Sequence, residues 1–98
     1  MDLYSYGNSL IKRLFTVLDL TKEAKTQDDF DNIEKFIEKL EVETKGCVSY
    51  YSDVKYGDQM NSVVMKISGI KSVSDYNLRR KVVLDSIEII NRVIKELN

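Results

Sequence analysis

The chain has no histidine, proline or tryptophan, and only one cysteine among its 98 residues. Without histidine it lacks the most common general base and the most common metal ligand. The single thiol, Cys47, can form neither an internal disulfide nor a zinc site with the usual four ligands, and we expect it at the edge of the core. The sequence therefore predicts a protein that is not an enzyme and that carries no cofactor and no metal.

Long hydrophobic runs and an excess of one charge are also missing. Fifteen Lys and Arg against sixteen Asp and Glu give a formal net charge of -1. No apolar run approaches the roughly 18 residues that a membrane span needs, and the first residues lack the basic start and apolar run of a secretory signal. We therefore expect a cytoplasmic protein in a host cell, with no membrane contact. Direct binding to nucleic acid is not expected, because the overall charge is not positive.

The residues that are present predict an all-α fold. The chain holds 28 Leu, Ile and Val residues, and they recur with a helical period. The first helix is predicted over about residues 2–25. Gly7 lies inside it and costs about 1 kcal/mol relative to alanine, so we expect the first turn to fray.

A second helix is predicted over residues 27–45. Thr26, followed three residues later by Asp29, is typical of a helix start, and Asp28 and Asp31 also suit the first turn. These acids lack the glycine and the distant glutamate of a calcium loop, so we interpret them as capping residues. Gly46 is expected to end the helix.

Residues 47–59 are predicted to form a loop, with a strand over CVSYY as the alternative. Tyr50, Tyr51 and Tyr56 alternate there with small polar residues, a composition typical of recognition loops. One interpretation is that these rings bind a partner. The other is that they cover the open end of a helical bundle.

The apolar period resumes after residue 58 and leaves two possibilities. Either one helix of about 38 residues continues to residue 96, or a helix ends near Gly69 and a new one starts at Ser74 or Asp75. A continuous helix would exceed the diameter of a compact chain of this size and would require a partner. The overall prediction is one domain over residues 1–98, in which a helical hairpin packs on this long, continuous or broken, C-terminal helix in a small bundle.

Two surfaces are predicted to bind partners. Arg79, Arg80 and Lys81 concentrate positive charge, whereas acids dominate residues 28–43. Together with the three tyrosines, this basic cluster is our candidate partner-binding site, and a solvated face is the alternative.

In the C-terminal helix, Ile89 and Val93 fall outside the main apolar stripe. We therefore predict that these two residues remain exposed and that the chain forms a homodimer through them. The stripe itself comprises Val83, Ile87, Ile90, Ile94 and Leu97.

The segment YSDVKYGDQMNSVVMKISGI and the later pattern D-x-x-x-x-R-K-V-V-L-D-S-I-E-I-I-N-R-V-I-K-E-L cover about half of the chain. Their layout resembles the helical front part of the autolysin-regulatory, late-operon activator family of Gram-positive phages, which are sigma-like regulators. The chain stops at Asn98, where the DNA-reading module of that family would begin, so DNA binding is not implied. The resemblance implies a phage or mobile-element origin and an accessory role on larger machinery.

The function expected from all of this is modulation of a larger host protein or ribonucleoprotein complex, as an inhibitor or regulator of defence or transcription machinery. The alternative is a structural module that assembles with itself through the C-terminal helix.

Overall fold

The computed structural model describes residues 3–50, 56–71, 73 and 75–97. This part of the chain forms four helices, α1 (Leu3–Glu23), α2 (Gln27–Tyr50), α3 (Gly57–Ile70) and α4 (Tyr76–Leu97). It contains no strand, so the all-α prediction is confirmed. Within CVSYY, residues 47–50 are helical and the strand alternative is wrong for them, while Tyr51 lies outside the described residues.

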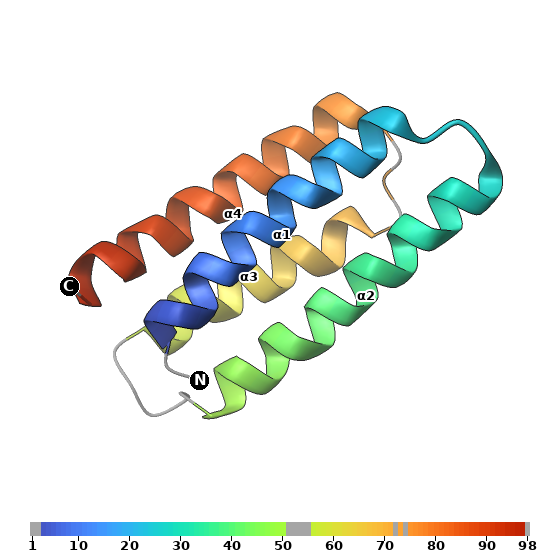
Figure 1. Cartoon of the computed structure of the whole chain (residues 1–98). Coiled ribbons are helices and arrows are strands. Elements are labelled where there is room, and N and C mark those ends of the chain that lie inside the picture. Colours follow the sequence, from blue (N-terminus) through green and yellow to red (C-terminus); the bar gives the residue numbers. More distant parts are fainter. Residues whose placement is uncertain (1–2, 51–55, 72, 74, 98) are drawn as a thin grey trace.

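The helices form an antiparallel bundle in which each one packs on two neighbours (Figure 1). The pairs in contact are α1 with α2, α2 with α3, α3 with α4, and α4 with α1, and the described residues show no contact across either diagonal. The bundle is 41 Å long and about 20 Å across. Such an up-down-up-down arrangement needs only short connections. Because the described part of the acid-rich helix α2 makes no contact with α4, these two helices occupy opposite corners of the bundle.

The core is formed by the apolar stripes that the sequence predicts. Aliphatic side chains from all four helices are shielded from solvent, as expected for helices that each turn one face inward. The fully buried aliphatic residues are Leu10, Leu14, Val17, Ile37, Leu40, Val63, Ile67, Ile70, Val83 and Ile90.

Gly7 has a packing role that the sequence does not reveal. A Cβ atom at this position would lie 3.0 Å from Cδ1 of Ile94 and 3.3 Å from Cγ2 of Ile90. These distances are shorter than normal contacts between carbon atoms. The glycine therefore allows α1 to approach α4 closely. The helix is continuous from Leu3 through Gly7, in contrast to the expected fraying.

Helix α2 starts as predicted and ends later than predicted. The amide of Asp29 donates to Oγ1 of Thr26 at 3.2 Å, and the amide of Thr26 donates to Oδ2 of Asp29 at 3.1 Å. This reciprocal pair is a capping box. Gly46 does not end the helix, which continues to Tyr50. The extra turn packs Cys47 and Val48 against the core, which favours continuing the helix past the glycine.

The C-terminal region forms two helices that pack on each other. Helix α3 ends at Ile70 and α4 begins at Tyr76, so the single long helix does not form. The amide of Leu78 donates to Oδ1 of Asp75 at 3.0 Å, which caps the start of α4. Because α4 folds back along α3, the length of this region no longer requires a partner.

Candidate protein-binding site

Several buried polar side chains hold the helices together. The hydroxyl of Thr44 on α2 donates to the carbonyl oxygen of Leu40 at 2.7 Å. Its only proton is thereby used, so the hydroxyl of Tyr6 on α1 donates to Thr44 at 2.9 Å. Burial raises the pKa of Tyr6, which keeps this phenol protonated. The pair therefore joins α1 to α2 and leaves no free nucleophile.

A second contact between α1 and α2 lies beside it. The guanidinium carbon of Arg13 is 5.5 Å from the centre of the Tyr6 ring, within the range of a cation–π interaction. The same guanidinium donates to the carboxylate of Glu43 on α2. Both groups are partly buried, so this ion pair is less screened by solvent than a fully exposed one.

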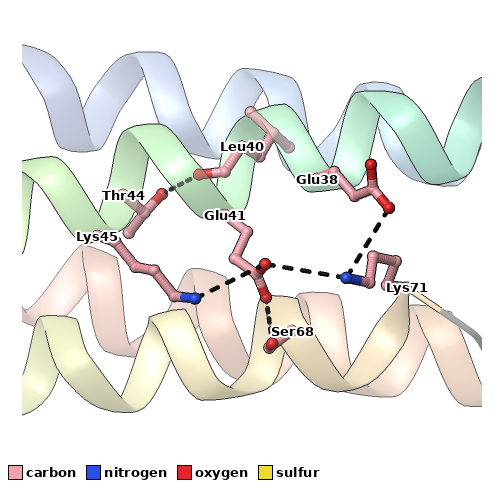
Figure 2. A network of polar contacts seen from close by, with 7 residues as sticks. All are labelled: Glu38, Leu40, Glu41, Thr44, Lys45, Ser68 and Lys71. Carbon is pink, nitrogen blue, oxygen red and sulfur yellow. Dashed lines mark hydrogen bonds and ion pairs between the residues drawn. The ribbon is translucent and has the colours of Figure 1, made fainter.

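Glu41 joins α2 to α3 at the centre of a polar network (Figure 2). Its carboxylate accepts a hydrogen bond from the hydroxyl of Ser68. The ammonium groups of Lys45 and Lys71 lie 3.8 and 3.9 Å from its other oxygen, and Lys71 also lies 3.9 Å from Glu38. The hydrogen bond from Ser68 is the main cause of the lowered pKa of Glu41, so this carboxylate remains charged. It is a structural anchor, not a proton donor.

Arg79 lies inside the bundle, contrary to the predicted basic surface cluster. Only 3% of the residue is exposed. Its guanidinium donates to Oγ1 of Thr21 at 2.9 Å and to the carbonyl oxygens of Ile70 at 3.0 Å and Lys71 at 3.4 Å. These carbonyls form the negative end of α3, which offsets the buried charge. Burial lowers the pKa of Arg79, while Glu34 acts in the opposite direction.

The predicted basic cluster is therefore incomplete. Arg80 and Lys81 are exposed on α4, but Arg79 binds the C-terminal end of α3 and is not available to a partner. The sequence could not separate Arg79 from its neighbours, because all three follow one another in a helix. Only the tertiary position of Thr21 and of the end of α3 distinguishes it.

The loop predicted over residues 47–59 is shorter in the structure. Residues 47–50 belong to α2 and residues 57–59 to α3, so the loop prediction is wrong for them, and residues 51–55 lie outside the described residues. Tyr50 ends α2, and its side chain, like all of Tyr51, is not described. Tyr56 precedes α3, is half-buried and packs against the core. Its position agrees with the interpretation in which a ring covers the end of the bundle.

The two residues of the predicted dimer surface differ in exposure. Val93 is only 2% exposed and belongs to the core, so the prediction that it remains exposed is wrong. It turns toward α3, which packs beside α4. The sequence left open whether these two helices are one continuous helix or a broken pair. Ile89 is half-buried and lines a groove of about 220 Å³ between α3 and α4. The other residues that line this groove are Gln59, Ser62, Arg92, Val93 and Glu96.

Metal-binding side chains are not clustered in the described part of the chain. Within it, no three His, Cys, Asp or Glu side chains are placed to hold a metal ion. Burial raises the pKa of the Cys47 thiol, so the reactive thiolate is disfavoured. Of the helices that the structure describes, none has both the length and the apolar character to cross a membrane.

A surface groove lies where α1 ends and α2 begins, and we call it the α1–α2 groove. Its volume is about 350 Å³, at the lower end of the range for ligand clefts. Leu20 is 38% exposed there and Phe36 is half-buried, so apolar surface faces solvent. The lining residues are Leu20, Glu23, Ala24, Asp29, Asn32, Ile33 and Phe36.

The charge at the groove is negative. Both ionisable residues that line it, Glu23 and Asp29, are acidic. Hydrogen bonds from the backbone amides of Lys25 and Thr26 lower the pKa of Asp29, which keeps its carboxylate charged. The groove therefore combines an apolar floor with an anionic rim. It is suited to an apolar side chain flanked by cations.

The sequence contains a signal for this groove. Leu20 and Phe36 both lie at the edge of the main apolar stripe of their helix. Because α1 and α2 are joined by only three residues, 24–26, edge residues near the turn must face one another.

Comparison with protein-family models, with curated proteins and with solved structures finds no match to this chain.

Proposed function

We propose that this chain is a non-enzymatic binding protein of phage or mobile-element type, which modulates a larger host protein or ribonucleoprotein complex in the cytoplasm. The observation that carries the proposal is the α1–α2 groove, an exposed apolar surface with an anionic rim. The buried polar side chains described above support it in a second way. Because these side chains form hydrogen bonds and ion pairs between helices, they hold the bundle together, and we assign the binding of a partner to the surface.

The groove favours a partner segment with one bulky apolar side chain and flanking lysine or arginine residues. Burial of an apolar side chain provides about 1.5 to 3 kcal/mol. Complementary charge around it increases the association rate and disfavours other partners. A protein segment fits better than a small molecule, because the groove is formed on the surface between two helices and not within the core.

Affinity capture with matched variants tests this proposal. The wild-type protein is immobilised beside Leu20→Lys, which places a charge in the groove. The control is Val42→Lys, because Val42 is 66% exposed on α2 and does not line the groove. A stoichiometric foreign partner should bind the wild type and the Val42 variant, and the Leu20 variant should lose it. Equal recovery by all three proteins would refute the groove as the binding surface.

The charge of the partner is tested on the same helix. Glu23→Lys reverses a charge that lines the groove, and Asp19→Lys makes the same change at an exposed position that does not. A cationic partner should be lost with Glu23→Lys and retained with Asp19→Lys. Retention by both variants at low salt would contradict a cationic partner.

The second candidate function is assembly of the chain with itself through α4. It is supported by Ile89, an apolar residue that is only half-buried and lines the groove between α3 and α4. Val93 belongs to the core and supports this candidate only as the floor of that groove. Recovery of only the protein itself in the capture experiment would favour this candidate over a foreign partner.

A further inference from the structure

One side of α4 carries charged residues in an ordered sequence around an apolar residue. Lys81, Asp85, Ile89, Arg92 and Glu96 are separated by four, four, three and four positions. Residues at these spacings follow one another along one side of a helix. Lys81, Arg92 and Glu96 are exposed, and Asp85 and Ile89 are half-buried. We call these five residues the α4 stripe.

The order of charges in the α4 stripe is complementary to itself. The midpoint between Lys81 and Glu96 along the sequence falls between residues 88 and 89. The midpoint between Asp85 and Arg92 falls at the same place. If two copies of α4 lie antiparallel about a two-fold axis at that point, Lys81 of each copy faces Glu96 of the other. In the same register, Asp85 faces Arg92.

From this pattern we infer that a second copy of this chain binds the α4 stripe in an antiparallel, two-fold arrangement. The inference rests on the second candidate function and gives it a surface and a register. A two-fold interface uses the same patch on both copies, so each ion pair forms twice. The two Ile89 side chains meet beside the axis, between the two sets of pairs.

The charges of the stripe are available for such contacts. Lys81, Asp85 and Glu96 make no ion pair with another residue that the structure describes. Arg92 is paired with Glu88 of its own helix, and both side chains are more than half exposed. In the dimer Arg92 lies between this glutamate and Asp85 of the second copy. It thereby neutralises Glu88, which lies close to the axis.

Apolar surface adjoins the stripe on the side of α3 and continues it toward the start of α4. The groove between α3 and α4 adjoins it and shares Ile89, Arg92 and Glu96. Leu78, three residues before Lys81, is 59% exposed. Apolar contact at the centre with charged pairs around it is the usual composition of a protein interface. The charge order then selects the antiparallel register.

Charge reversal with rescue tests the register. Lys81→Glu places a negative charge opposite Glu96 of the second copy, twice in each dimer. The double variant Lys81→Glu with Glu96→Lys exchanges both charges and restores the two pairs. The control is Lys39→Glu, which changes net charge by the same amount on α2, at the opposite corner of the bundle.

Sedimentation equilibrium of the full chain at low salt, where surface charges are least screened, provides the measurement. The wild type and the Lys39 variant should sediment at twice the chain mass of 11.4 kDa. The Lys81 variant should dimerise about tenfold or more weakly, and the double variant should recover. If Lys81→Glu does not weaken dimerisation, or if the double variant does not restore it, this register is wrong although the chain still associates with itself. A wild-type monomer at high micromolar concentration would overturn both.

Discussion

Replacing Gly7 by alanine should leave the bundle less stable than the same replacement at a glycine with open space around it, although alanine is the better helix former. The new Cβ atom would lie 3.0 and 3.1 Å from Cδ1 and Cγ1 of Ile94. Normal contacts between carbon atoms start at about 3.5 Å, so α1 and α4 must move apart or Ile94 must leave its rotamer. Overpacking of this kind costs about 1 to 3 kcal/mol.

Gly46 provides the matched control. Gly7 is the fifth residue from the start of α1, and Gly46 is the fifth residue from the end of α2. A Cβ atom at Gly46 meets nothing within 4 Å. Gly46→Ala should therefore gain up to about 1 kcal/mol from helix propensity alone. Gly7→Ala has the same gain but also the overpacking cost, so the two variants should differ by about 1 to 3 kcal/mol.

Urea unfolding monitored by circular dichroism at 222 nm, a wavelength that reports helix, measures both free energies of unfolding. In a thermal melt of the same variants, a difference of 1 kcal/mol in the free energy of unfolding would correspond to about 4 to 8 °C in Tm for a chain of this size. We expect Gly46→Ala to have a larger free energy of unfolding than the wild type, and Gly7→Ala to have a smaller one than Gly46→Ala. If both alanine variants are stabilised equally, the close approach of α1 to α4 is refuted.

Three further predictions concern polar contacts. Arg79→Ala should lower the free energy of unfolding by about 2 to 3 kcal/mol, because it removes charged hydrogen bonds from a buried site, whereas Arg80→Ala should change it by less than about 0.5 kcal/mol in the same urea titration. Because folding lowers the pKa of Glu41, its contribution to stability is present above the ordinary glutamate pKa and is lost as pH falls through the lowered value. Glu41→Gln should therefore flatten the loss of stability as pH falls below the ordinary glutamate pKa, and an unchanged pH profile would contradict this. Thr26→Ala should cost about 1 kcal/mol by removing the cap of α2, and thermal unfolding that matches the wild type would exclude the capping box.

The helices could be predicted from the sequence because their signals are local. The capping pair Thr26 and Asp29 lies within one turn, and the apolar periods need no knowledge of the partner helix. The end of α2 could not be predicted from Gly46, since the gain from packing Cys47 and Val48 on the core depends on the other helices of the bundle. The turn after Ile70 also depends on tertiary structure, because Arg79 closes the end of α3 from the following helix.

The candidate sites were harder to predict than the fold. Arg79, Arg80 and Lys81 are chemically similar and consecutive, yet one is buried and two are exposed. Val93 was assigned to the surface because the sequence does not say that α3 folds back beside α4. The α1–α2 groove arises from residues on two helices, and neither helix alone marks it. What the sequence does contain is the charge order of α4, which lies within a single element.

The central claim is that this chain binds a foreign protein through the α1–α2 groove. Amide hydrogen exchange, compared between the free chain and the chain in its captured complex, tests it most directly. We predict that exchange slows in the complex at the end of α1 and in the first half of α2, around Leu20 and Phe36. Protection confined to α3 and α4, with exchange at the groove unchanged, would contradict the claim.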